Sequence, residues 1–208
     1  MTGQLAPAWA AFDLLAIFVF ALTGALTAAA KRQTLVTFGF FAFVTGVGGG
    51  TARDLLIGAP VFWVDRNAPL AACLLAALAV WLTPRRWWSA RTLDWLDAVG
   101  LAAFATFGAV KALAYGVAPL PAVAMGVLTG CLGGIVRDVL AGQPSILMRP
   151  ELYVTAAALS AGLAVGLLLL GAPALLAGPI AAGAGFALRA LAISRGLRLP
   201  AYGARRRR

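Results

Sequence analysis

The chain contains no histidine, and its two cysteines, Cys73 and Cys131, both lie within apolar stretches. Without histidine, the common first-row metal sites and the histidine-based catalytic triads lack their essential parts. Buried free cysteines behave as small apolar side chains, so these thiols indicate neither a disulfide framework nor a redox compartment. The sequence offers no pairing of nucleophile and base, and we expect neither an enzyme nor a cofactor.

Charge is also scarce. Charged residues make up 12% of the chain and hydrophobic residues 62%, with a mean hydropathy of +0.92. These values lie outside the range of soluble domains and predict a multi-pass membrane protein. The opening residues, MTGQLAPAW, lack the basic start and the small-residue cleavage site of a signal peptide. We therefore expect the first apolar stretch to be a retained membrane helix.

Seven apolar segments approach the ~20 residues that a helix needs to cross a bilayer. They cover residues 9–30, 34–58, 67–83, 94–114, 119–142, 151–170 and 174–193.

The loops between these segments differ in charge. One set holds Lys31, Arg32, Arg85, Arg86, Arg91, Arg149, Arg195, Arg198 and Arg205 to Arg208, whereas the other offers only Arg66 beside Asp65. The positive-inside rule then places the N-terminus outside and the C-terminus in the cytoplasm. We interpret the net charge of +10 as a topology signal, with no nucleic-acid partner, and expect the basic tail to attract anionic lipids of the bilayer.

The chain contains an internal repeat. A shift of 84 residues aligns residues 13–60 with residues 97–144 without a gap, and 16 of these 48 pairs are identical. Each copy holds three predicted helices, an odd number, so the second copy must be inverted in the membrane. The predicted fold is therefore all-α, with inverted three-helix repeats in residues 1–89 and 90–172. A seventh helix and the basic tail occupy residues 173–208.

Both copies place glycine runs inside a predicted membrane helix, in TGVGGGTARDLLIGAP and TGCLGGIVRDVLAGQP. Glycine costs a helix ~1 kcal/mol relative to alanine, so we expect the second and fifth helices to break or bend there. Interruptions at matching positions of inverted repeats are typical of a central permeation or binding site, although glycine also permits close helix packing. The candidate pore and hinge residues are Thr45, Gly48, Gly49, Gly50, Thr129, Gly133 and Gly134.

An arginine and an aspartate follow each glycine run, at Arg53 and Asp54 and at Arg137 and Asp138. Charges in the apolar layer are costly unless they pair or face water, which makes these residues functional candidates. Neighbouring residues point about 100° apart on a helix, so we expect crossed pairs, Arg53 with Asp138 and Arg137 with Asp54. Alternatively, the charges only lock the two halves together.

Lys111 completes the candidate charge network, although its repeat partner is the uncharged Thr27. Near the outer end of its helix, Lys111 would either extend towards the headgroups or face a cavity as a gate. Asp13 and Asp97 lie in the first turns of their spans, where we expect them to stabilise helix N-termini. A role at a pore mouth is the alternative for both aspartates.

The chemistry of the motif leaves the transported ion open. A broken helix offers carbonyl groups to a cation and amide groups to an anion. Free carbonyls and the hydroxyls of Thr45 and Thr129 would suit a monovalent cation, whereas the arginines oppose one unless the aspartates neutralise them.

The segments GGGTARDLLIGAP and GGIVRDVLAGQP, one in each inverted repeat and with a seventh helix behind, resemble those of the bacterial trimeric intracellular cation channel (TRIC) family. The resemblance covers residues 10 to 195. It implies a homotrimer in the bacterial inner membrane, with a pore in each subunit that passes K⁺ or Na⁺. The glycine runs would be kinks, with Arg53 and Arg137 near the pathway, and Leu132 in place of Gly48 would weaken the second kink.

Two other functions fit the same residues. A secondary transporter of a small zwitterion such as glycine would use a half-helix N-terminus for the carboxylate and Asp54 or Asp138 for the ammonium group. A membrane scaffold would carry no substrate. A channel produces unitary currents, whereas a carrier shows saturable uptake.

Overall fold

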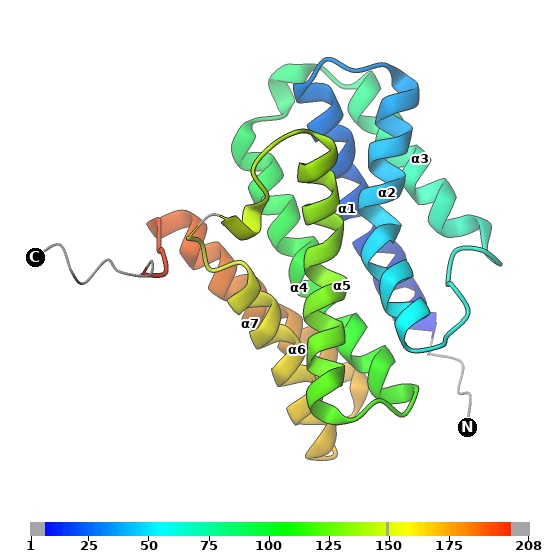
Figure 1. Ribbon diagram of the computed structural model, residues 1–208, viewed down its shortest axis with the longest axis vertical. Helices are drawn as coiled ribbons and strands as arrows, with labels where there is room; N and C mark the ends of the chain where they lie inside the picture. Colours follow the sequence, from blue (N-terminus) through cyan, green and yellow to red (C-terminus); the bar gives the residue numbers. More distant parts are fainter. Residues whose placement is uncertain (1–6, 149, 201–208) are drawn as a thin grey trace, which may run out of the picture.

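The computed structural model describes residues 7–148 and 150–200, which form seven α-helices and two short 3₁₀ helices (Figure 1). The predicted membrane helices are confirmed to within four residues at each end. The α-helices are α1 (Pro7–Ala30), α2 (Leu35–Leu56), α3 (Asn67–Leu82), α4 (Ala90–Ala114), α5 (Pro119–Leu140), α6 (Val154–Leu169) and α7 (Ala174–Arg195). The 3₁₀ helices are η1 (Arg85–Trp87) and η2 (Ile146–Met148).

The first three α-helices and the next three form the two inverted repeats. In Figure 1, α2 descends and α5 rises beside it, so the matching helices of the two repeats run in opposite directions. Helices α1 and α3 pack with α2, while α4 and α6 pack with α5, and α7 covers α4 and α6. The predicted fold class is confirmed, and the limits of the three parts, near residues 89 and 172, stay a prediction.

Local sequence signals set the helix ends. The Thr34 side chain accepts a hydrogen bond from the backbone of Thr37 at the start of α2, and Ser89 forms a reciprocal capping box with Thr92 before α4. Helices α2 and α5 are each followed by a glycine in the left-handed region, Gly58 with φ of 67° and Gly142 with φ of 62°.

The helices differ in length. By length and composition, α1, α2, α4, α5 and α7 can cross a membrane, whereas α3 and α6 have 16 residues each. At ~1.5 Å per residue, 16 residues rise about 24 Å. The third helix of each repeat is therefore shorter than the ~30 Å hydrocarbon layer.

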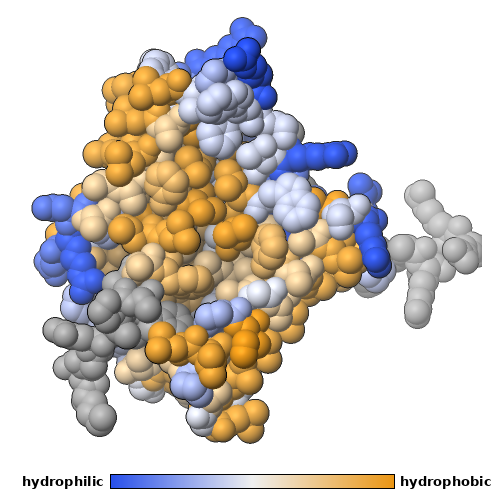
Figure 2. Space-filling model, turned by 180° about the vertical axis from the view of Figure 1, so that it is seen from behind, coloured by the Kyte–Doolittle hydropathy of each residue, from blue (hydrophilic) through white to orange (hydrophobic). Residues whose placement is uncertain are grey.

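The surface of the helical body is apolar. Figure 2 shows orange, apolar side chains over most of one face, with hydrophilic residues gathered at its margins. Val36, Leu120 and Leu170 are 80% or more exposed, as side chains that face lipid would be. The interior between the helices is rich in alanine and glycine, because in lipid close backbone packing takes over from burial of large side chains.

The glycine runs do not break the helices. Helices α2 and α5 are continuous α-helix through Gly48–Gly50 and Gly133–Gly134, so the expected unwinding is wrong. A methyl group placed on Gly49 would strike the carbonyl oxygen of Thr129, and one placed on Gly133 would lie 2.5 Å from the carbonyl oxygen of Thr45. These reciprocal contacts form the crossing of α2 and α5, and glycine is needed there for close approach.

Gly48 differs from its neighbours. Among the described residues, a methyl group on Gly48 would meet nothing within 4 Å, whereas one on Gly50 would lie 2.6 Å from the Phe62 ring. The position matching Gly48 in the second repeat is Leu132, and both residues are half-buried. A side chain is thus accommodated at this position, and the difference between the repeats leaves the crossing unchanged.

The crossing predicts different effects for two neighbouring substitutions. Gly49→Ala should lower the stability by about 1–3 kcal/mol, because the new methyl group overpacks the contact with α5. Gly48→Ala is the matched control and should leave the stability unchanged or raise it by up to ~1 kcal/mol through helix propensity. Thermal unfolding of the detergent-solubilised variants measures both, and equal losses would contradict the assignment of the crossing.

Candidate functional site

The repeated arginine and aspartate pair with each other inside each repeat. Nη2 of Arg53 lies 2.8 Å from Oδ1 of Asp54, and Nη2 of Arg137 lies 2.9 Å from Oδ1 of Asp138. In each pair Nε donates to the same oxygen, at 2.8 Å and 3.0 Å. The long arginine side chain bends back to reach the carboxylate of the next residue. The angle between neighbouring residues on a helix does not predict this contact.

The expected crossed pairs are not formed among the described residues. Because α2 and α5 run in opposite directions and each motif lies near the C-terminal end of its helix, the two motifs lie at opposite ends of the bundle. Two separate groups result. We call Arg53, Asp54 and Lys111 the Arg53 cluster, and Arg137, Asp138 and Asp97 the Arg137 cluster.

The second oxygen of each aspartate holds the loop that follows its helix. Oδ2 of Asp54 accepts a hydrogen bond from the backbone of Phe62 at 3.1 Å, and Oδ2 of Asp138 accepts one from Ile146 at 3.0 Å. Phe62 and Ile146 are 84 residues apart, the spacing of the repeat. Part of the motif is therefore structural, because it fixes the chain where each helix ends.

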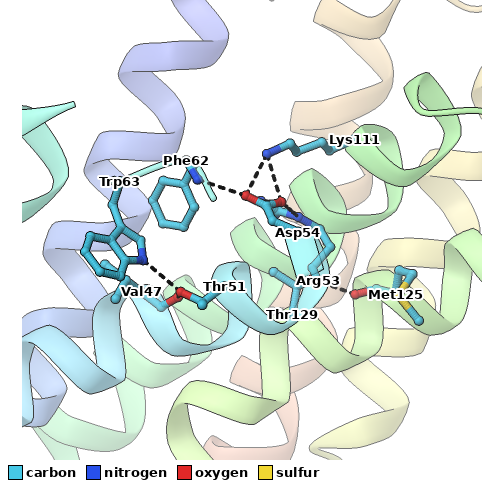
Figure 3. A network of polar contacts seen from close by, with 9 residues as sticks. All are labelled: Val47, Thr51, Arg53, Asp54, Phe62, Trp63, Lys111, Met125 and Thr129. Atoms are coloured by element: carbon cyan, nitrogen blue, oxygen red, sulfur yellow. Dashed lines mark hydrogen bonds and ion pairs between the residues drawn. The ribbon is translucent and has the colours of Figure 1, made fainter. Parts of the chain in front are cut away.

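Lys111 joins the two repeats at the Arg53 cluster. Its Nζ lies 2.8 Å and 2.9 Å from the oxygens of Asp54, so an ion pair connects α4 with α2 (Figure 3). The Lys111 side chain is 11% exposed. It therefore forms a buried ion pair and does not extend towards the lipid headgroups.

The loop beside the Arg53 cluster has a second attachment. Nε1 of Trp63 donates to Oγ1 of Thr51 at 2.9 Å, and that hydroxyl donates to the carbonyl oxygen of Val47 at 2.8 Å (Figure 3). This attachment fixes the loop to the side of α2, next to the Arg53 cluster.

The Arg137 cluster takes its extra charge from α4. Nη1 of Arg137 lies 2.7 Å from Oδ1 of Asp97 and donates to Oγ1 of Thr23 at 3.0 Å. Asp97 lies seven residues beyond the start of α4, which Ser89 caps, so the expected role at a helix N-terminus is wrong. Asp13 likewise lies beyond the first turn of α1, where the dipole effect fades.

Besides Lys111, the clusters differ at a second repeat-related position. Arg137 donates to Thr23, whereas the guanidinium of Arg53 lies 5.3 Å from the ring centroid of Phe107, the repeat partner of Thr23. Nη1 of Arg53 is buried and has no hydrogen-bond partner among the described residues. The Arg53 cluster thus has a lysine and an unsatisfied guanidinium, whereas the Arg137 cluster has a second carboxylate.

Thr45 and Thr129 lie between the clusters, at the crossing itself. Oγ1 of Thr129 donates to the carbonyl oxygen of Met125 at 2.6 Å (Figure 3). Oγ1 of Thr45 is buried and has no hydrogen-bond partner among the described residues. All seven candidate pore and hinge residues lie on the central parts of α2 and α5, whereas the five candidate charges lie at the two ends.

The sequence interpretation passed over one group of polar residues. Arg189 of α7 is buried, and its Nη2 lies 2.6 Å from Oε2 of Glu151, with the Tyr153 ring beside it. A signal was present, because Arg189 is a charge inside a predicted membrane span, and such residues are functional candidates.

The ion pairs predict where coupling will be measured. A double-mutant cycle with Asp54→Asn and Lys111→Gln should give a coupling energy of about 1 kcal/mol or more, because the two groups share a buried ion pair. The matched cycle with Arg53→Gln and Asp138→Asn should give coupling near zero, because the residues belong to different clusters. Coupling in the second cycle alone would contradict the described pairing; unfolding by denaturant in detergent measures both.

The sequence matches a family model described as Glycine transporter over residues 10–85 and 94–168. The UPF0126 membrane protein of Vibrio cholerae is 43% identical over 150 residues, which span 69% of this chain and 62% of that protein. The UPF0126 membrane protein of Deinococcus radiodurans is 42% identical over 154 residues, 72% of each protein.

Solved structures of channels share the fold. A TRIC channel orthologue from Rhodobacter sphaeroides is 42% identical, with a TM-score of 0.84 over 91% of this chain and 99% of that one. A prokaryotic TRIC channel crystallised in 0.5 M KCl is 25% identical, with a TM-score of 0.85 over 94% of this chain and all of that one. These relatives are channels and membrane proteins, not enzymes. The chain therefore belongs to the TRIC family, which the matching sequence model describes as Glycine transporter.

Proposed function

We propose that this protein conducts monovalent cations, K⁺ among them, through a pathway in each subunit of a homotrimer. The pathway follows the crossing of α2 and α5 and has the Arg53 cluster at one end and the Arg137 cluster at the other. The similarity to solved cation channels supports the channel, and the name of that family supports the trimer.

One observation carries the path of the ion. Oγ1 of Thr45, Nη1 of Arg53 and Oδ2 of Asp97 are buried polar atoms without a hydrogen-bond partner in the described residues. Each such atom costs about 1–3 kcal/mol when no water reaches it. They belong to the crossing, to the Arg53 cluster and to the Arg137 cluster, so water at these three atoms would hydrate the proposed pathway at its middle and at both ends.

Lys111 would act as the gate of this pathway, because its ammonium group lies at the Arg53 cluster. An ammonium group in the pathway repels cations, and Asp54 holds this one by two short contacts. Movement of the lysine would leave Asp54 to balance Arg53. Cations would then meet a neutral pair at this end and a second carboxylate, Asp97, at the other.

Potassium currents test this function. Wild-type protein in a planar bilayer under a potassium gradient should give discrete steps that reverse near the potassium equilibrium potential. Lys111→Gln should change the open probability or the unitary conductance several-fold, because the gating charge is gone. Lys31→Gln, the same change at an exposed lysine of the loop between α1 and α2, is the control and should behave as wild type.

A carrier of a small zwitterion is the second candidate, supported by the description Glycine transporter. The contacts of the motif weigh against it. Both oxygens of Asp54 and of Asp138 already accept hydrogen bonds, and α2 and α5 offer no half-helix N-terminus for a carboxylate. Saturable uptake of radiolabelled glycine into proteoliposomes, without unitary currents, would replace the channel by the carrier.

The distribution of basic loops supports an orientation with the N-terminus outside and the C-terminus in the cytoplasm. In Figure 1 the connection between α1 and α2 and the segment between α3 and α4 lie at one end of the bundle, and the loop between α2 and α3 lies at the other. The first two segments expose Lys31, Arg32, Arg85 and Arg86, whereas the third exposes Asp65 and Arg66. The basic residues 201–208, with their proposed attraction to anionic lipids, lie outside the described residues.

Reporter fusions in a bacterial host test this orientation. Green fluorescent protein fused to the C-terminus should be fluorescent, and alkaline phosphatase at the same place should be inactive, because the first folds only in the cytoplasm and the second only outside it. An active phosphatase fusion would reverse the assignment of the two sides.

A further inference from the structure

Helix α7 carries a buried charge that the proposed pathway does not use. The Arg189 side chain is 1% exposed, although the helix around it is apolar. Its guanidinium pairs with Glu151 at 2.6 Å and lies 5.5 Å from the centroid of the Tyr153 ring, while Nε has no hydrogen-bond partner in the described residues. A helix that only had to pack would be held as well by apolar side chains, without a desolvated charge.

Tyr153 connects this charge to the Arg137 cluster. It lies at the N-cap position of α6 and is 1% exposed. A methyl group placed on Gly134 would lie 2.8 Å from Oη of Tyr153, 3.4 Å from Oδ1 of Asp97 and 3.6 Å from Nη2 of Arg137. Three polar groups thus converge on one glycine of α5. Arg189, Tyr153, Asp97 and Arg137 form a continuous series of neighbours from α7 to the charge cluster.

The joint between Tyr153 and Asp97 is not closed. Among the described residues, Oη of Tyr153 and Oδ2 of Asp97 have no hydrogen-bond partner, although both side chains lie beside Gly134. A small side-chain movement would bring the hydroxyl onto the free carboxylate oxygen. Such a movement would give Asp97 a second arrangement, with Oδ2 bound by Tyr153 in place of an Oδ2 without a partner among the described residues.

The Arg53 cluster has no such connection among the described residues. Gly50, the repeat partner of Gly134, faces the apolar ring of Phe62 in place of a hydroxyl. The seventh helix packs on α4 and α6, and in the described residues its buried arginine reaches only the second repeat. The asymmetry places any influence of α7 at the Arg137 end.

The segment between η2 and α6 is also held by the chain beyond α7. The backbone of Leu199 donates to the carbonyl oxygen of Pro150 at 2.8 Å, and Arg198 forms an antiparallel bridge with Glu151. Residues 150–153 therefore contact both α7 and the chain that follows it. A displacement of either element reaches Tyr153.

We propose that α7 regulates the Arg137 end of the pathway, with Arg189 and Tyr153 as positioning residues that set whether Oδ2 of Asp97 is bound or open. This inference rests on the proposed channel function. Arg189 holds the Tyr153 ring, and the Tyr153 hydroxyl holds Asp97 away from the ion. Loosening of α7 or of residues 198–199 releases the carboxylate and favours conduction.

The first test needs no current. A cycle with Arg189→Lys and Asp97→Asn, measured by thermal unfolding in detergent, should show non-additive shifts in melting temperature although the two side chains belong to different ion pairs. The non-additivity should disappear when Tyr153→Phe is present in every variant, because that change removes the hydroxyl and keeps the ring. Additive shifts in the Tyr153 background would overturn the inference.

The second test measures conduction. Tyr153→Phe and Glu151→Gln should shift the ratio of open to closed time by about 5-fold or more in planar bilayers, a usual size for coupling between sites. Arg195→Gln, an exposed arginine on the same helix, is the matched control and should behave as wild type. Wild-type gating in Tyr153→Phe would overturn the inference. A silent wild-type protein would overturn the channel function itself, a result separable from the unfolding cycle.

Discussion

At Gly49 and Gly133, two antiparallel helices meet backbone to backbone, each turning a bare Cα towards a carbonyl oxygen of the other. Lipid gives no hydrophobic drive for helices to associate, so contact between backbones and the dispersion energy it brings must hold the repeats together. The same contact sets α2 against α5 in opposite directions. The two charge clusters consequently lie at opposite ends of the bundle, and the threonines lie between them.

The charges of each motif have a structural role. Each motif aspartate uses one oxygen for its arginine and the other for the backbone of the following loop, which satisfies a buried carboxylate within a few residues of chain. The clusters differ in the side chain that α4 adds, Lys111 in one and Asp97 in the other. Asp97 has an identical repeat partner, Asp13, whereas the repeat partner of Lys111 is Thr27, so the lysine is the charge found in one repeat only.

Hydropathy and the internal repeat were sufficient to predict the helices, their order and their inversion, because the bilayer imposes length and backbone satisfaction on every span. Hydropathy and the repeat do not predict which side chains pair with each other. An arginine can curl back onto the next residue, so Arg53 finds Asp54, whereas helix angles alone suggested a distant partner. Arg189 escaped notice because a single charge hardly alters the apolar average of α7, and its partner Glu151 lies in a loop. The glycine runs are conspicuous in the sequence, but whether such a run bends a helix or admits a neighbouring backbone depends on the residues that lie opposite it.

Helices α3 and α6, with 16 residues each, are shorter than the hydrocarbon layer and so create a hydrophobic mismatch with the bilayer. A short span is accommodated by thinning the adjacent bilayer or by association with other protein, at a cost of fractions of a kcal/mol for each ångström. Because the two helices belong to inverted repeats, the deformation acts on both sides of the α2 and α5 crossing. The free energy of this protein then depends on the thickness of the membrane. Contact of α3 or α6 with neighbouring protein, in place of lipid, would reduce that dependence.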